Sequence, residues 1–456
     1  MGILNKLAAW LDTKRGVKHC TFNPKGPGVV RIHLIPPRFS LLQSPPYIVI
    51  LNGYYLLPLG PSWALLLSVF IDEVNAFAGK PIDDADRDAI CERVIARVSK
   101  AFPVVRREAL REDLLDMTEI LFAIARGEET DVQIDKMSLR TYAPFMRAPH
   151  RMDLMVSAMT DAEGHWQCNQ KCMFCYAAGE QLGKTKELSR EEWCEIIDKL
   201  RRAGVPMLTF TGGEPTGRDD LAELIAHAKW FVTRLNTNGR LLTPALVAQL
   251  TDAELDNVQI TLYAADADIH NKLVGGAYHH ETVAGIKAAL AGGLDVSVNT
   301  PLCRLNADYV STLGFLHGLG VRFVTVSGLI CTGGATTAHA QYDLSEAELA
   351  AVLRDAKEFC DANGMEMDFT SPGLVSAEVL QEIGLRAPAC GAALSNMAIA
   401  PDGTVVPCQS WLSREGALGH MLTDDFDTVW GHSLAKRLRA MDDEQAKDCP
   451  FRGRTI

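Results

Sequence analysis

Short apolar runs alternate with helical segments between residues 152 and 329, and no other feature of the sequence restricts the fold as strongly. Repeats of strand and helix build a parallel sheet with right-handed crossovers. Two helical segments begin with recognisable capping residues, Ser189 followed by Glu192 and Thr243 followed by Pro244. The six predicted strands are residues 154–158, 207–210, 231–235, 258–262, 296–298 and 323–326.

Six repeats are fewer than the eight of a complete barrel. We therefore expect an α/β fold, a partial (β/α)6 TIM barrel, with an open mouth at the carboxyl ends of its strands. Active-site loops follow the strands at that end of a barrel. Polar or metal-binding residues directly after a predicted strand are therefore the candidates for function.

The blocks on either side of the repeats have a different character. Residues 1–20 have the pattern of a short amphipathic helix, and Asn52-Gly53 between two apolar runs predicts a hairpin. A second hairpin is predicted around residues 401–403. Helices are predicted at 62–74, 86–101, 106–127 and 345–362. We expect three domains: a winged-helix-like α+β domain at 1–150, the barrel at 151–331 and a C-terminal extension at 332–456.

The composition excludes several classes of protein. The net charge of −12 makes the chain a poor general binder of nucleic acid, whose affinity comes mostly from neutralised phosphates. The uncharged run at 47–71 is interrupted by Pro58 and Pro61, so it is a poor membrane-spanning candidate. Twelve cysteines without an export signal indicate metal or redox chemistry rather than disulfides. We expect a cytoplasmic protein with no nucleic-acid or membrane partner.

Cys168, Cys172 and Cys175 are the strongest chemical signal in the chain. They follow the first predicted strand, and three thiolates within eight residues can bind one metal centre if the segment is a loop. Three cysteines are one short of filling a [4Fe–4S] cube, so one iron would stay open to a small molecule. A zinc site would instead need a fourth protein ligand, for which His165 is the candidate.

With Phe174 directly before the third cysteine, this segment resembles the CxxxCxxC motif of the radical SAM superfamily. Thr211-Gly-Gly-Glu-Pro215, at the end of the second strand, resembles the GGEP segment of that family. The resemblance implies a catalytic [4Fe–4S] cluster on the three cysteines, with S-adenosyl-L-methionine chelated by the open iron. One electron then cleaves the sulfonium–carbon bond, and the 5′-deoxyadenosyl radical takes a hydrogen atom from the substrate.

The same resemblance assigns further residues to the cofactors. Gly212, Gly213 and Pro215 would let the backbone approach the nucleotide, and Glu214 would hold its methionine amino group. Phe174 and Tyr176 flank the third cysteine, and Tyr176 would pack over the cluster or the adenine. The remaining candidates are polar residues on the third to fifth strands, and ordinary hydrogen bonding explains the last three equally well: Asn236, Asn238, Gln259, Thr261 and Asn299.

Cys390, Gly403 and Cys408 have the spacing of the opening of the SPASM/twitch extension, which follows many barrels of this superfamily. With Cys449, this resemblance implies one auxiliary [4Fe–4S] cluster. Its fourth ligand is Cys331, a substrate group, or no group at all. The alternative is that these cysteines are small buried hydrophobic residues. His270, after the fourth strand, is either a substrate contact or a residue that structures its loop.

Together these features resemble the peptide maturases of the SPASM group, which modify ribosomal peptides. A hairpin followed by three helices resembles the PqqD-type recognition element, which binds a leader peptide by strand addition. We expect a radical SAM oxidoreductase whose partners are a precursor peptide, bound through 1–150, and a flavodoxin- or ferredoxin-type electron donor. The alternatives are a dehydrogenase or synthase acting on a free small molecule and an enzyme similar to sulfatase maturases.

Overall fold

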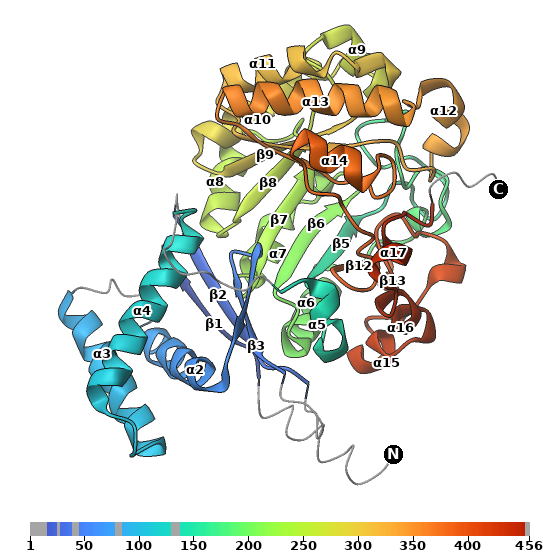
Figure 1. Cartoon of the computed structure of the whole chain (residues 1–456). Coiled ribbons are helices and arrows are strands. Elements are labelled where there is room, and N and C mark those ends of the chain that lie inside the picture. Colours follow the sequence, from blue (N-terminus) through green and yellow to red (C-terminus); the bar gives the residue numbers. More distant parts are fainter. Residues whose placement is uncertain (1–15, 25–27, 39–44, 78–83, 129–136, 452–456) are drawn as a thin grey trace. The chain divides into compact units, whose positions relative to one another are not determined.

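The computed structural model describes residues 16–24, 28–38, 45–77, 84–128 and 137–451 (Figure 1). The chain divides into two compact units. The first comprises Met1–Ala148 with Arg201–Pro206, and the second comprises Pro149–Leu200 with Met207–Ile456. Within the described residues, no helix has the length and apolar character needed to span a membrane.

The first unit combines an antiparallel sheet with three long helices. The four strands pair in chain order: β1 (Lys18–Phe22), β2 (Val30–Ile35), β3 (Tyr47–Leu51) and β4 (Tyr55–Leu59). The helices that follow are α2 (Pro61–Asn75), α3 (Asp84–Ala101) and α4 (Arg107–Ala125), and the short helices α5 (Leu139–Tyr142) and η1 (Ala143–Phe145) complete the unit. Buried side chains of the sheet and of the three long helices form one core, which includes Val49, Leu67, Val94 and Leu114.

The hairpin and the three helices of this unit are confirmed, but two details differ from expectation. The helix predicted for residues 1–20 is wrong over its last residues, because Lys18–Phe22 pairs with β2 as a strand, and residues 1–15 lie outside the described part. Leu51 pairs with Tyr55, so the β3–β4 turn has three residues rather than two. Positive φ angles at Asn52 (48°) and Gly53 (75°) make this turn possible.

The second unit contains the predicted barrel strands. Six consecutive strands run parallel, each beside the next: β5 (Arg151–Ser157), β6 (Met207–Gly212), β7 (Val232–Thr237), β8 (Asn257–Thr261), β9 (Asp295–Pro301) and β10 (Phe323–Ser327). The helices between them are α6 (Arg190–Ala203), α7 (Leu221–His227), α8 (Pro244–Asp252), α9 (Ala267–Val274), α10 (His279–Ala291) and α11 (Tyr309–Leu319). All six predicted strands are confirmed, as are the caps at Ser189 and Thr243.

The sheet extends beyond these six strands at both edges. After α12 (Ala335–Tyr342) and α13 (Glu346–Ala362), β11 (Glu366–Phe369) adds in parallel beside β10. At the other edge, β12 (Asn396–Ile399) pairs in parallel with β5, and its hairpin partner β13 (Thr404–Val406) leads to β14 (Gly419–His420). The remaining helices are α14 (Ala377–Ile383), α15 (Phe426–Trp430), α16 (Ser433–Arg439) and α17 (Asp443–Ala446). The C-terminal hairpin therefore continues the barrel sheet (Figure 1).

Side chains alternate between the two faces of the central strands. Leu235, Val258, Ile260 and Val298 are fully buried on one face. Their neighbours on the opposite face are polar and only half-buried: Arg234, Asn236, Gln259, Thr261 and Asn299. The interior face of the barrel is therefore polar and partly open.

Candidate active site

The first cysteine site consists of Cys168, Cys172 and Cys175, on the loop that follows β5. The structure brings these three thiols into electrostatic contact. Burial raises the pKa of Cys168 to about 12, and the neighbouring Glu214 carboxyl and Cys175 thiol raise this pKa further. Burial likewise raises the pKa of Cys172, with contributions from both other thiols. The loop thus gathers three thiols that are protonated at neutral pH, so a bound metal would displace their protons.

Contacts from distant parts of the chain fix the course of this loop. The Met173 amide donates to the Leu273 carbonyl at the end of α9 (2.8 Å). The Gly334 amide, from the segment after β10, donates to the Cys175 carbonyl (2.8 Å). A Cβ on Gly333 would lie 2.2 Å from the same carbonyl oxygen, so only glycine allows this close approach.

Gly212 and Gly213 end β6 where it meets the end of β5. The Gly213 amide donates to the Ser157 carbonyl (2.8 Å), and the Cys168 thiol donates to the Gly213 carbonyl (3.4 Å). A Cβ on Gly213 would lie 2.5 Å from the Ala158 carbonyl oxygen, and a Cβ on Gly212 would lie 2.3 Å from that of Ser157. The diglycine is therefore required by packing within the protein, beside the first cysteine.

Glu214 is a buried carboxylate that accepts hydrogen bonds from several donors. Its Oε1 accepts from the Thr216 amide (3.1 Å), the Thr216 hydroxyl and the Thr237 hydroxyl (2.6 Å). Its Oε2 accepts from the Asn238 amide (2.8 Å). Burial raises the pKa of Glu214, while these hydrogen bonds lower it. The carboxylate thus joins the ends of β6 and β7, and Oε2 retains an acceptor position for a further donor. Pro215, the next residue, is buried at the start of the 3-10 helix Pro215–Gly217.

Asn238 connects the end of β7 to the first cysteine site. Its side-chain amide donates to Asn169 Oδ1 (2.6 Å), and Arg240 donates to the Asn169 carbonyl. The Arg240 guanidinium also lies over the Tyr278 ring, 3.5 Å from its centre. Sequence reasoning missed Asn169 and Arg240, although both flank predicted motifs and could have been suspected for that reason.

The looser candidates on the strands have different surroundings. Gln259 donates to the Thr325 hydroxyl (3.0 Å), which donates to Asn299 (2.9 Å). These two residues are thus bound to one another through a threonine that sequence reasoning missed. Asn236 differs, because its Oδ1 is buried and has no hydrogen-bond partner among the described residues. Thr261 is half-buried on the same interior face.

The two aromatic candidates pack into separate apolar groups beside the first cysteine site. Phe174 is buried next to Leu273 and meets the Tyr342 ring edge-on, with ring centres 5.9 Å apart. Tyr176 packs with Cys168 and Cys175 against an apolar layer whose buried members are Met155, Met159, Ala177, Leu182, Ala398, Ala400, Val406 and Leu412. Burial raises the pKa of Tyr176. Both rings therefore shield the thiols from water.

The second cysteine site consists of Cys390, Cys408 and Cys449. Burial raises the pKa of Cys408 to about 12, and the Cys390 and Cys449 thiols raise this pKa further, so both lie near enough to Cys408 to interact with it electrostatically. The Cys390 amide donates to the Ala446 carbonyl (2.7 Å), which ties the first cysteine to the segment that carries the third. Trp411, whose amide donates to the Cys408 carbonyl (3.0 Å), packs on the apolar layer from this side.

These residues fit the cofactors better than a mononuclear zinc site. Within the described part of the chain, no three Cys, His, Asp or Glu side chains converge tightly enough for a single metal ion. His165, the candidate fourth zinc ligand, is 77% exposed and pairs with Asp161 (3.0 Å). An iron–sulfur cube binds its thiolates at separate corners, so three grouped thiols without a fourth suit a cube with one open iron. The unpartnered Asn236 Oδ1 offers an acceptor for a nucleotide.

His270 does not lie on a loop, so that prediction is wrong. It belongs to α9, and its side chain is fully buried, where Nδ1 accepts from the Tyr263 amide (3.3 Å). Burial, together with neighbouring His279, lowers its pKa to about 4. His270 thus stabilises the connection between β8 and α9, in agreement with the structuring role.

Two family comparisons match the parts of the chain that hold the two cysteine sites. Residues 167–316 match the radical SAM superfamily. Residues 390–450 match SPASM, an iron–sulfur cluster-binding domain. The described residues include all twelve cysteines, and none of them is in a disulfide.

Individual relatives extend this similarity. The chain is 30% identical over 278 residues to the PqqA peptide cyclase of Ruegeria pomeroyi, covering 59% of this chain and 70% of that protein. It is 31% identical over 220 residues to a probable GTP 3′,8-cyclase of Methanopyrus kandleri, covering 45% and 70%. The fold resembles Streptococcus suis SuiB bound to the precursor peptide SuiA, with a TM-score of 0.58, 14% identity and coverage of 87% and 88%.

Proposed function

The chain belongs to the radical SAM superfamily and carries a SPASM domain, and from this premise we propose that it modifies a ribosomally made precursor peptide. It is an enzyme that uses a [4Fe–4S] cluster and S-adenosyl-L-methionine, with iron–sulfur binding also in its C-terminal domain. The bound cofactors supply a 5′-deoxyadenosyl radical that abstracts hydrogen. On the peptide, the outcome is a crosslink or another covalent modification. A PqqA peptide cyclase among its relatives supports this assignment.

We assign the residues as follows. Cys168, Cys172 and Cys175 hold the catalytic cluster, and the second cysteine site holds one auxiliary cluster. The nucleotide lies at the ends of β6 to β9, near Gly212, Gly213, Glu214, Pro215, Asn236, Asn238, Gln259, Thr261 and Asn299, with Phe174 and Tyr176 excluding water. Electrons come from a flavodoxin- or ferredoxin-type donor. A cytoplasmic location fits a chain whose cysteines form no disulfide within the described residues.

The observation that carries the peptide assignment is the outer edge of β4 in the first unit, within the proposed recognition domain 1–150, with which no strand pairs among the described residues. The Asn52 amide donates to the Arg31 carbonyl of β2 (2.9 Å), so alternate residues of β3 face β2 and the others face β4. The β3 residues that face β4 include Val49 and Leu51. Their partners on β4, Leu57 and Tyr55, therefore face β3. Leu56 and Pro58 therefore present their backbone groups outward from β4.

The opposite edge of the same sheet is closed. By the same alternation, His19 and Thr21 face outward from β1. The Asn75 side chain at the end of α2 donates to the His19 carbonyl (2.8 Å), and the Lys18 ammonium pairs with Asp72 of α2 (2.6 Å). Because α2 occupies the β1 edge, a peptide strand would add to β4.

A pair of proline substitutions in the full-length enzyme tests this assignment. Leu56→Pro removes the outward amide of β4, and Thr21→Pro removes one of the two outward amides of β1. Proline is tolerated where the lost amide faces outward on an edge strand, so both variants should fold. We expect Leu56→Pro to weaken binding of a small peptide encoded beside this gene about 10-fold, and Thr21→Pro to leave it within about twofold.

Equal binding by both variants would exclude strand addition on β4. Failure of the unmodified enzyme to bind or alter any such peptide would exclude the peptide assignment itself. The thermal transition and the iron content of each variant establish that it is folded and loaded.

The second candidate is a reaction on a free small molecule, which the 31% identity to a probable GTP cyclase favours. The polar interior face of the barrel, with Arg234 and Gln259, would suit a polar substrate. Turnover of GTP or another free nucleotide without any peptide would favour this candidate.

A further inference from the structure

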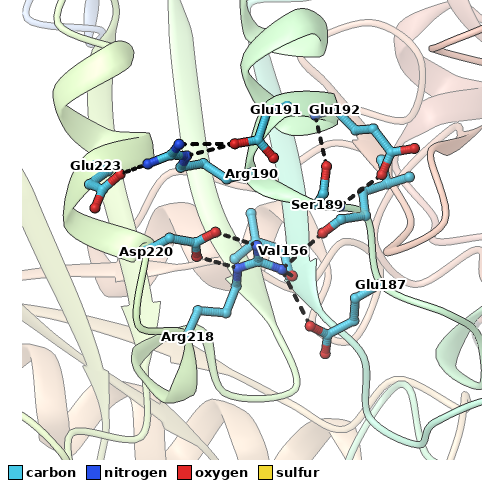
Figure 2. A network of polar contacts seen from close by, with 10 residues as sticks. Val156, Glu187, Ser189, Arg190, Glu191, Glu192, Arg218, Asp220 and Glu223 are labelled. Carbon is cyan, nitrogen blue, oxygen red and sulfur yellow. Dashed lines mark hydrogen bonds and ion pairs between the residues drawn. The ribbon is translucent and has the colours of Figure 1, made fainter.

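A half-buried network of polar contacts lies shortly after the GGEP segment (Figure 2). Its centre is Arg218, whose side chain is 11% exposed. The guanidinium binds Asp220 through two parallel hydrogen bonds, Nε to Oδ1 (2.8 Å) and Nη2 to Oδ2 (2.7 Å). Its Nη1 faces the other way and meets Glu187 Oε2 (3.3 Å). One cation thus joins two carboxylates from different segments.

The same network also holds backbone at the carboxyl end of β5. Arg218 Nη1 donates to the carbonyls of Val156 (2.9 Å) and Leu188 (3.2 Å). Glu187 Oε1 accepts from the Ala158 amide (2.8 Å). Val156 and Ala158 flank Ser157 in the chain. The network binds a backbone group of each, so it holds the backbone on both sides of Ser157.

Ser157 and Ala158 are the residues against which the diglycine packs. A Cβ on Gly212 would lie 2.3 Å from the Ser157 carbonyl oxygen, and one on Gly213 would lie 2.5 Å from that of Ala158. Neither glycine has room for a Cβ, and the Gly213 amide donates to the Ser157 carbonyl (2.8 Å), so the β6 end lies directly against the β5 end and follows its position. The network therefore fixes the backbone on one side of the GGEP segment, which lies beside Cys168.

We propose that Arg218, with Glu187 and Asp220, is a positioning residue for the S-adenosyl-L-methionine subsite. It acts through the β5 and β6 backbone rather than by contact with the nucleotide. Lysine cannot replace it, because an ammonium lacks the planar fork that binds a carboxylate through two bonds while reaching a carbonyl on the other side. The inference rests on the family chemistry and is independent of the peptide substrate.

A second network in the same view provides a matched control. Arg190 pairs with Glu191 (2.9 Å) and with Glu223, and its side chain is 47% exposed. Within the described part of the chain, the Arg190 side chain binds these two carboxylates and no backbone group of β5 or β6. Removing Arg190 therefore removes an arginine–carboxylate network of similar composition without releasing the β5 end.

Binding of S-adenosyl-L-methionine to the reconstituted full-length enzyme tests the proposal. Arg218→Lys and Arg218→Met should each raise the Kd at least ~10-fold, because small displacements of binding groups have effects of that order. Arg190→Met should stay within about twofold. In peptide-free cleavage, the KM for the nucleotide should rise more than kcat falls. Iron and sulfide counts of the Arg218 variants should match those of the unmodified enzyme.

A milder substitution keeps the test decisive if Arg218→Met does not fold or load. Glu187→Gln retains an acceptor for the Ala158 amide and removes the charge opposite Arg218, so we expect a Kd increase of about threefold. An unchanged Kd in loaded Arg218→Lys and Glu187→Gln proteins would overturn the proposal. An equal increase in Arg190→Met would overturn it too, because surface charge would then explain the effect.

Discussion

Each of the two cysteine sites groups three thiols, but the chain brings the thiols together differently in each. Cys168, Cys172 and Cys175 lie within eight residues of one loop, so the local sequence brings the thiols together. Cys390, Cys408 and Cys449 span sixty residues, and they meet only because β12 joins the barrel sheet and the Cys390 amide binds Ala446. A local sequence motif therefore forms the first site, whereas the second site depends on tertiary structure.

The largest expected effect comes from removing one cysteine from each site. Cys172→Ala should abolish cleavage of S-adenosyl-L-methionine and lower the iron content by about four atoms per chain, because three thiolates are the minimum for the first cube. Cys408→Ala should lower iron by a similar amount but leave peptide-free cleavage in place. Iron and sulfide analysis, with detection of 5′-deoxyadenosine, measures both. Loss of cleavage in both variants would show that the second site supports the first.

Glycine substitutions give the next largest effect. Gly213→Ala places a Cβ 2.5 Å from a backbone oxygen that cannot move, so we expect nucleotide binding to weaken ~10-fold or more. Gly403→Ala, in the hairpin of the second site, places its Cβ 2.9 Å from the His420 ring at a φ of +91°. It should cost roughly 1–3 kcal/mol of stability and leave nucleotide binding unchanged. Calorimetry and thermal unfolding separate the two outcomes, and weaker nucleotide binding by Gly403→Ala would contradict the distinction.

The smallest expected effect is a loss of local stability at acidic pH. We expect it at the first cysteine site and not at the second. The pKa of His270 is lowered to about 4, so between the ordinary histidine value and pH 4 the unfolded chain binds a proton that the folded chain does not. Stability is therefore present at neutral pH and lost as the pH falls through this range. Because α9 holds the cysteine loop at Met173, the hydrogen-exchange protection factors of residues 171–175, which correct for the slower intrinsic exchange in acid, should fall at pH 5, while those of residues 396–406 should not.

His270→Gln provides the control for this acid effect, because glutamine can accept from the Tyr263 amide and does not titrate. The loss of protection at pH 5 should be smaller in this variant. An equal loss of protection in the variant and the unmodified protein would exclude His270 as its source.

The sequence alone predicted the parts of the molecule that depend on local pattern. Periodicity located β5 to β10 and α13, and capping residues located the starts of α6 and α8. The spacing of the cysteines and the diglycine located the first site. The sequence did not predict β11, a strand of four residues whose pairing with β10 depends on tertiary contacts.

Other parts could not be predicted, because they depend on which strands become neighbours. β1 has too short a pattern to outweigh the apolar spacing of residues 1–20, and only β2 makes it a strand. The hydrogen bonds of Glu214 to Thr237 and Asn238 require β6 beside β7. The role of Arg218 follows from the meeting of β5 and β6, which no spacing in the sequence records.

The outward backbone groups of β4 also determine the register of any peptide strand that pairs with β4. Leu56 offers both an amide and a carbonyl, whereas Pro58 offers only a carbonyl. A docked strand can exchange two hydrogen bonds at Leu56 alone, so sliding by two residues forfeits the single donor. A peptide strand that docks on β4 would therefore bind in one register, with its own hydrogen-bonding residue opposite Leu56.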